Sequence, residues 1–226
     1  MMDSVSAVPS DMTVVRVAAP VRQQVADRLR EALLQQRFLP GERLVERHLC
    51  DLTGASRASV REALRHLETE GLVVNVPQTG MVVASVSTED AKAIYAVRAV
   101  LEGLAAKLFT ANASEEQRAR LRTVAAELSG TTDPMAVLAI KERFYEVLFE
   151  GAGSPIIPQI IRPLHTRVAV MRAQSLAHEH RPEAAAKEIL AILEAIEAGD
   201  GEAASEAASF HVSQAAATLF SSSNTD

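Results

Sequence analysis

The chain has 226 residues and a formal net charge of −6, and its 48% of hydrophobic residues excludes a mostly disordered chain and allows two domains with buried cores. No apolar run approaches the roughly 20 residues of a membrane span, and the first residues lack the basic start of a signal peptide, so we expect no membrane partner. The single cysteine, Cys50, excludes an internal disulfide framework and favours a reducing, cytoplasmic location.

The charges are unevenly distributed along the chain, which bears on nucleic-acid binding. Residues 20–86 carry nine arginines and eight acidic residues, whereas residues 87–226 carry thirteen basic and nineteen acidic residues. An acidic surface is repelled by a phosphate backbone. Any contact with DNA is therefore expected to come from residues before about Ser87.

The chain begins with a segment of mixed composition, residues 1–17, which we predict to be a flexible N-terminus. A first helix is predicted to open at Pro20 and to run to about Arg37, where the Pro40–Gly41 pair stops it. Its apolar face consists of four residues at a spacing of four, namely Val21, Val25, Leu29 and Leu33.

A helix-turn-helix is predicted next. Glu46–Thr53 reads as a short helix, and the tight Gly54–Ala55 link is typical of the corner between two such helices. Ser56 is a good N-cap for the second helix, because its hydroxyl can accept a hydrogen bond from a free amide of the first turn. The apolar face of this second helix consists of Val60, Leu64 and Leu67.

Arg57, Arg61 and Arg65 lie four residues apart on a different face of the second helix. Guanidinium groups on one exposed stripe can contact phosphates, and the first two can reach guanine edges in a major groove. A solvated helix face is the alternative interpretation. The β-prone runs Leu72–Val74 and Met81–Val83 predict a hairpin wing after the helix, and this order of elements favours DNA binding.

The remainder of the chain shows helical patterns and no strand pattern, which predicts an antiparallel bundle of about six helices. These helices are expected at about 89–110, 115–129, 134–150, 155–178, 183–198 and 202–219, with Thr88 and Ser114 as N-caps. The predicted fold class is therefore mostly α, with an N-terminal winged helix-turn-helix (residues 18–86), an all-α bundle (residues 87–220) and a flexible tail (residues 221–226).

Several stretches resemble one family. Pro40–Leu44, Glu46–Leu49 and Ser56–Leu72 resemble the winged-helix domain of GntR-type bacterial transcriptional regulators. Tyr95–Glu102 and Ala191–Asp200, with His211 after them, are similar to the ligand-binding (FCD) domain of the fatty-acid-regulator subfamily. The resemblance covers about residues 20–219. It implies a homodimer that binds double-stranded operator DNA of short palindromic sequence, with an affinity that a small metabolite changes.

The resemblance also implies that Arg47, Arg57 and Arg61 contact DNA. With the cap and the arginine stripe, the predicted DNA-binding residues are Arg47, Ser56, Arg57, Ser59, Arg61 and Arg65. Many family members carry Arg or His at the wing tip, whereas this chain has Pro77–Gly80 there. A minor-groove contact by the wing is therefore not carried over.

Many domains of this subfamily hold a divalent metal with one Asp and three His, and the first two form an Asp-x-x-x-His pattern on one helix. The matching positions here are Lys141 and Tyr145, Ile189 stands at the second His position, and His211 remains. An ammonium group repels a metal ion, and one imidazole cannot hold it. We therefore predict no metal and no cofactor.

Arg98 has apolar neighbours at helical spacing, which predicts that it points into the bundle. Together with Lys141, Tyr145 and His211 it is expected to form a positively charged, hydrogen-bonding end of an effector pocket. Such a pocket suits a carboxylate or phosphate group. The alternative is structural: Arg98 pairs with Glu102 at i+4, Lys141 pairs with a nearby Glu, and Tyr145 packs.

The remaining candidates favour structural roles. The His178–His180 segment is expected at a surface helix end, His165 is expected to be a satisfied structural residue, and Cys50 is expected to be a small buried hydrophobe. The sequence shows no Gly-rich phosphate loop and no nucleophile elbow, so we predict no enzyme. The predicted function is a repressor of transcription that senses a small anion, and the alternative is a bundle that serves only as a dimerisation module without an effector.

Overall fold

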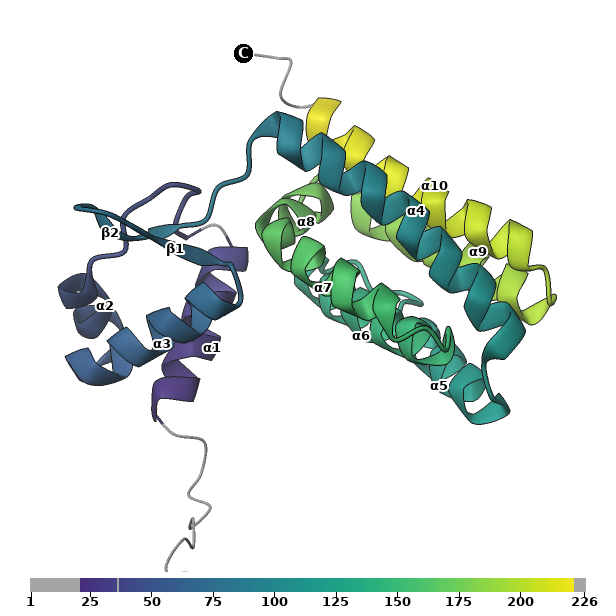
Figure 1. Cartoon of the computed structure of the whole chain (residues 1–226), viewed down its shortest axis with the longest axis horizontal. Helices are drawn as coiled ribbons and strands as arrows, with labels where there is room; N and C mark the ends of the chain where they lie inside the picture. Colours follow the sequence, from purple (N-terminus) through teal and green to yellow (C-terminus); the bar gives the residue numbers. More distant parts are fainter. Residues whose placement is uncertain (1–20, 36, 222–226) are drawn as a thin grey trace, which may run out of the picture.

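The computed structural model describes residues 21–35 and 37–221. The predicted flexible N-terminus and residues 222–226 of the predicted tail lie outside these residues. The structure consists of a small winged-helix domain and a larger helical bundle, joined by a short segment that leads from the wing into the first helix of the bundle (Figure 1). This mostly α architecture confirms the predicted fold class.

The winged-helix domain has the predicted order of elements, namely α1 (Val21–Leu34), α2 (Glu46–Thr53), α3 (Arg57–Thr69), β1 (Val73–Val76) and β2 (Gly80–Val83). The apolar faces of the three helices and the inner side of the hairpin form one core. The strands pair antiparallel, with Val73 opposite Val83. Helix α1 ends at Leu34, three residues before the predicted end at Arg37.

The corner between α2 and α3 is formed as its residues predict. Gly54 closes α2 in the left-handed region at φ 67° and donates its amide to the carbonyl of Cys50. Ser56 caps α3 by accepting a hydrogen bond from the amide of Ser59 at 3.2 Å. Cys50 is half-buried against the core rather than fully buried, because one side of α2 faces solvent.

The bundle contains seven helices in the described residues: α4 (Thr88–Asn112), α5 (Glu115–Ala126), α6 (Pro134–Gly151), α7 (Ile156–Arg167), α8 (Ala169–Leu176), α9 (Arg181–Glu197) and α10 (Gly201–Ser221). The predicted single helix at 155–178 is wrong, since it is divided at Val168 into α7 and α8. Val168 is fully buried against Ile94 and Val212, so packing decides this break. Ser87 rather than Thr88 caps α4.

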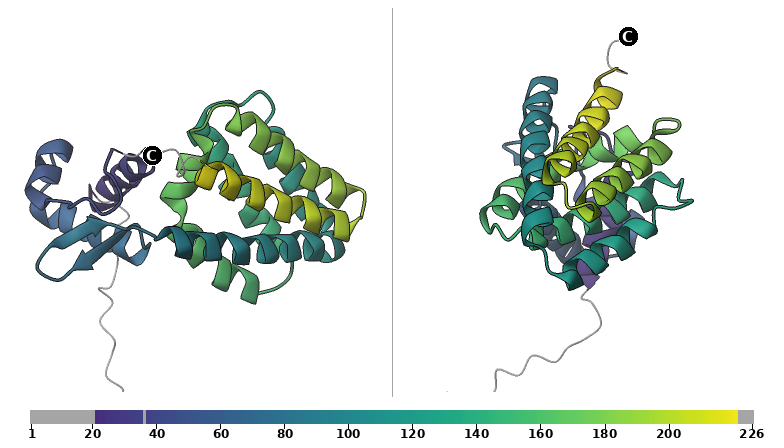
Figure 2. Two further views of the ribbon diagram at one scale, coloured as in Figure 1. Left: turned by 90° about the horizontal axis from the view of Figure 1, so that it is seen from above. Right: turned by 90° about the vertical axis from the view of Figure 1, so that its right-hand side faces the viewer.

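Helices α4 and α10 run side by side along the bundle (Figure 2). Gly103 of α4 makes their close approach possible, because a Cβ atom there would lie 2.6 Å from the hydroxyl of Ser209. Ser209 donates this hydroxyl to the carbonyl of Ala99 at 2.8 Å.

The two domains touch each other directly. Leu34 of α1 packs against the core of the bundle, and Ala169 of α8 packs against the core of the winged helix. A Cβ atom added to Gly71 would lie 3.6 Å from the methyl group of Thr166. Among the described residues, no helix combines the length and the apolar character needed to cross a membrane.

Candidate functional site

The outer face of α3 carries the predicted arginine stripe. Arg57, Arg61 and Arg65 are exposed, whereas the opposite face of the helix is buried in the winged-helix core. Arg47 of α2, the helix before the short link to α3, is also exposed. This arrangement presents several guanidinium groups to a partner, as major-groove recognition requires.

These arginines differ in the ion pairs that they already form within the protein. Arg61 donates two hydrogen bonds of 3.0 Å to the carboxylate of Glu46, which raises the pKa of Arg61 and lowers that of Glu46. Arg65 pairs with Glu62 at 2.8 Å. In the part of the chain that the structure describes, Arg57 forms no ion pair. A new partner would therefore have to displace Glu46 from Arg61, whereas Arg57 is available without such an exchange.

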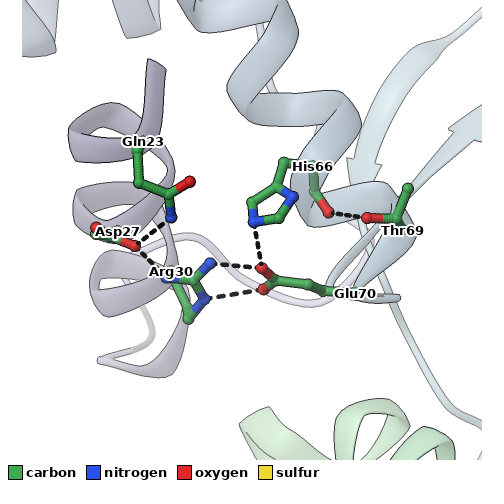
Figure 3. Close-up of polar contacts among 6 residues, drawn as sticks. All are labelled: Gln23, Asp27, Arg30, His66, Thr69 and Glu70. Carbon is green, nitrogen blue, oxygen red and sulfur yellow. Dashed lines mark hydrogen bonds and ion pairs between the residues drawn. The ribbon is translucent and has the colours of Figure 1, made fainter. Parts of the chain in front are cut away.

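A polar brace fastens the end of α3 to α1 (Figure 3). Arg30 donates to both carboxylate oxygens of Glu70, at 2.8 and 2.5 Å, and to Asp27 at 2.6 Å. These carboxylates raise the pKa of Arg30. His66 adds a contact of 3.1 Å to Glu70. The brace holds α3 in a fixed orientation relative to α1, which is the helix that faces the bundle (Figure 1).

The interior of the bundle holds an unusual set of charged side chains. Among the described residues, one buried acidic side chain, Glu102, lies in the protein together with four buried basic ones, namely Arg98, Lys141, Arg172 and Arg181. Burying a charge without a partner is costly, so such an excess of cations needs an explanation. All four predicted effector residues, Arg98, Lys141, Tyr145 and His211, are at most 5% exposed.

Arg98 and Glu102 form the centre of this cluster. The Nε of Arg98 donates to Oε1 of Glu102 at 3.0 Å, and Nε2 of His165 lies 2.8 Å from the same oxygen. The guanidinium of Arg98 also stacks on the ring of Tyr95 at 4.7 Å. Arg98 therefore forms the ion pair with Glu102 that a purely structural role predicts. Its Nη1, however, has no hydrogen-bond partner among the described residues.

Arg172 of α8 has fewer hydrogen-bond partners than Arg98. Its side chain is 5% exposed, and its nearest carboxylate is Glu142, 3.6 Å from Nη1. Within residues 21–35 and 37–221, its Nε and Nη2 have no hydrogen-bond partner. Burial and the positive charge of Arg98 lower the pKa of Arg172. Arg172 therefore offers two spare donors in a desolvated place, where a charge-assisted hydrogen bond is strong.

Lys141 and Tyr145 lie between the two ends of the cluster. Burial and the neighbouring Arg172 move the pKa of Lys141 well below its ordinary value, and no carboxylate pairs with it in the described chain. Burial and the Glu102 carboxylate raise the pKa of Tyr145, so its hydroxyl stays neutral. The Tyr145 ring lies 5.8 Å from the His165 ring and 6.4 Å from the His211 ring.

Elsewhere in the cluster, Glu188 of α9 forms hydrogen bonds with two side chains. It accepts a hydrogen bond of 2.6 Å from Nδ1 of His211 and two, of 2.9 and 2.8 Å, from Arg181. Burial and the charge of Lys141 lower the pKa of His211 to about 3, which leaves a neutral imidazole at pH 7. His211 is therefore held by a protein carboxylate and is oriented within the bundle.

These residues do not fit the metal site of the subfamily. Lys141 and Tyr145 stand at two of the ligand positions, Ile189 is fully buried in apolar surroundings, and His211 is committed to Glu188. Among the residues placed in the structure, no group of three or more His, Cys, Asp or Glu could hold a metal ion. The chemistry of the donor set suits an anion instead.

Several residues of the cluster are absent from the predicted effector set. Arg172 carries the same signal as Arg98, because its helical neighbours Val168 and Leu176 are apolar. His165 is hydrogen-bonded to Glu102, as expected of a structural histidine whose polar atoms have partners. It is nevertheless part of the buried cluster. His180 is exposed, as predicted for that surface segment.

The buried imidazoles make stability depend on pH. Burial lowers the pKa of His165 to about 4 and that of His211 to about 3, both below the unfolded value of about 6.5. Between pH 7 and pH 5 the unfolded chain therefore takes up protons that the folded chain does not, and the free energy of unfolding falls by about 2–4 kcal/mol. Urea denaturation at both pH values measures this loss.

Two variants identify which residue causes this pH dependence of stability. His211→Gln is expected to remove about half of the pH dependence, and His180→Gln, at an exposed position, is expected to retain all of it. An equal pH dependence in His211→Gln and in the unmodified protein would contradict this assignment.

The comparisons with known proteins agree with this geometry. The family described as bacterial regulatory proteins, gntR family, matches residues 21–83, and the FCD domain matches residues 93–214. These two matches coincide with the winged helix and with the bundle.

Individual relatives cover nearly the whole chain. The uncharacterized HTH-type transcriptional regulator YdhC of Bacillus subtilis (strain 168) is 26% identical over 191 residues, which cover 83% of this chain and 85% of that protein. The HTH-type transcriptional repressor RspR of Escherichia coli (strain K12) is 26% identical over 201 residues, which cover 86% and 87%. The solved structure of E. coli McbR/YncC shares the fold, with a TM-score of 0.74 at 22% identity over 92% of this chain and 100% of that chain.

Proposed function

The chain belongs to the GntR family of bacterial transcriptional regulators and carries an FCD domain, and from this premise we propose that it is a repressor whose operator affinity is set by a small anion bound in the bundle without a metal. The observation that carries the effector proposal is that two buried guanidiniums, those of Arg98 and Arg172, keep donors without partners among the described residues. A carboxylate or phosphate that reached Arg98 and Arg172 would satisfy donors that lack partners among the described residues.

The proposal assigns roles to the residues expected from the sequence. Arg47, Ser56, Arg57, Ser59, Arg61 and Arg65 bind DNA, and Arg98, Lys141, Tyr145 and His211 bind the effector. The proposed domains are residues 18–86 and 87–220. Repression is proposed because the relative RspR is named a repressor. A cytoplasmic location follows from the proposed DNA partner in a bacterial cell.

We also propose a homodimer, because a palindromic operator needs two recognition helices in successive major grooves. The outer face of α4 supports this arrangement. Val97, Val100 and Leu104 follow one another at helical spacing and are 46%, 69% and 41% exposed. A stripe of exposed apolar residues on a long helix fits a second copy of the same helix across a twofold axis.

The test begins with operator selection from random DNA and continues with a screen of carboxylate and phosphate metabolites on the resulting complex. An effector that couples to DNA is expected to change operator affinity by about 5- to 150-fold. The response is expected to persist in chelator-treated protein, because the donor set does not fit a metal. Fluorescence anisotropy of labelled operator measures both results.

Two outcomes would contradict the proposal. If no metabolite of either class alters operator affinity, the bundle acts as a dimerisation module alone. If chelation abolishes the response and a divalent ion restores it, the effector binds through a metal.

A further inference from the structure

A cavity of about 400 Å³ lies at the junction of the two domains. The winged helix contributes Arg30, Glu70 and Leu72 to its wall, and the bundle contributes Tyr145, His165 and Arg172. Helix α1 and helix α8 face each other at this place (Figure 1). The volume lies within the range of about 300–1,000 Å³ that is common for sites of small ligands.

The bundle side of this cavity is formed in part by a buried guanidinium whose hydrogen bonding is incomplete. Arg172 lines it while being 5% exposed, and its Nε and Nη2 lack hydrogen-bond partners among the described residues. Tyr145, whose buried hydroxyl has no hydrogen-bond partner among the described residues, contributes to the same wall. A buried guanidinium with two free donors recognises an oxyanion in a bidentate manner. This wall therefore places beside the cavity a cation with two enclosed donors that an entering carboxylate or phosphate would satisfy.

The winged-helix side is formed by the brace of Figure 3. Arg30 and Glu70 line the cavity and are bonded to each other, so this wall is close to neutral and rigid. Glu70 directly follows α3, the helix that carries the arginine stripe. A molecule in the cavity that is held at Arg172 thus touches the part of the winged helix that fixes the orientation of α3.

We propose that the junction cavity is where the effector acts: a compact carboxylate- or phosphate-bearing molecule binds Arg172 and contacts the winged helix directly through the Arg30–Glu70 wall. This inference rests on the proposed function and makes it more specific: of the four proposed effector residues Tyr145 lines this cavity, and Arg172 and the winged helix complete the site. A ligand that contacts both domains binds with different affinities to states in which the two domains have different relative orientations. That difference is what a change in DNA affinity requires.

Glu142 provides a sensitive test of this site. Its carboxylate is 52% exposed, lines the cavity and lies 3.6 Å from Nη1 of Arg172, so it competes with an incoming anion. Glu142→Gln removes that competition without emptying the bundle interior. Glu150→Gln is the matched control, because Glu150 lies on the same helix, is 51% exposed and pairs with Arg120 outside the cavity.

The experiment titrates full-length protein, without DNA, with succinate and with inorganic phosphate in a calorimeter. At least one of the two anions is expected to bind, and the two arms show whether a carboxylate or a phosphate is preferred. Glu142→Gln is expected to tighten binding by about threefold or more, Arg172→Met to weaken it by about tenfold or more, and Glu150→Gln to leave it unchanged. A gain in affinity cannot arise from a folding defect, so Glu142→Gln decides the result if Arg172→Met is unstable.

Hydrogen exchange locates the bound anion. Binding is expected to slow exchange of amides in α1 and in residues 70–72, as well as in α8. The inference is overturned if neither anion binds at millimolar concentration, if Glu142→Gln binds no more tightly than the control, or if protection is confined to the bundle. Because DNA is absent, these outcomes are distinct from a failure of the proposed repressor, which would appear as a lack of operator binding or of an effector response.

Discussion

Replacing Arg57 and Arg61 together with alanine is expected to cost about 2–6 kcal/mol of operator binding, a loss of at least about thirtyfold. Both guanidiniums are exposed on α3, and each bidentate contact with a guanine edge contributes about 1–3 kcal/mol of discrimination. Anisotropy titrations at fixed ionic strength measure the loss. Arg143→Ala is the control, because Arg143 pairs with Glu127 on the exposed surface of the bundle.

The single variants are expected to differ in kind. Arg61→Ala should relax the sequence preference at one position of each half-site, whereas Arg47→Ala should weaken all sequences alike and reduce the salt slope by about one. To bind DNA, Arg61 would have to leave Glu46, so part of its expected contribution offsets a lost ion pair. An unchanged operator affinity in the Arg57→Ala, Arg61→Ala double variant would refute this DNA interface.

Arg98→Met is expected to lower the free energy of unfolding by about 3–5 kcal/mol. Glu102 is fully buried, and the charge of Arg98 and the hydrogen bond from His165 hold its pKa below the ordinary value despite burial. Without the guanidinium, the folded protein must keep a buried carboxylate with much less compensation. Chemical denaturation at pH 7 measures the loss.

Two control variants test this explanation. The double variant Arg98→Met, Glu102→Met is expected to recover most of the lost stability, because it replaces the pair with apolar side chains of similar size. Arg122→Met, which breaks an exposed pair with Glu197, is expected to cost less than about 1 kcal/mol. If Arg98→Met cost no more than Arg122→Met, the buried pair would not be the centre of the cluster.

The sequence alone determined the elements whose signals are local. Ser56 and Gly54 specify the cap and the corner of the helix-turn-helix through hydrogen bonds and backbone angles of their immediate neighbours. Helical periodicity placed the arginine stripe outside and Arg98 inside, because one apolar face must be buried. The exchange of metal ligands for Lys141 and Tyr145 was likewise visible from the family resemblance.

The tertiary structure alone decided which polar groups meet. Glu102 and His165 are 63 residues apart, and packing of α7 against α4 brings them to 2.8 Å. The chain breaks at Val168 between α7 and α8 and brings Arg172 near Arg98. The apolar helical neighbours of Arg172 indicate that it is buried, but they do not indicate which residues it meets. The junction cavity combines residues of both domains. Such contacts depend on how whole helices and domains pack, and this packing is not encoded in the spacing of residues along any single helix.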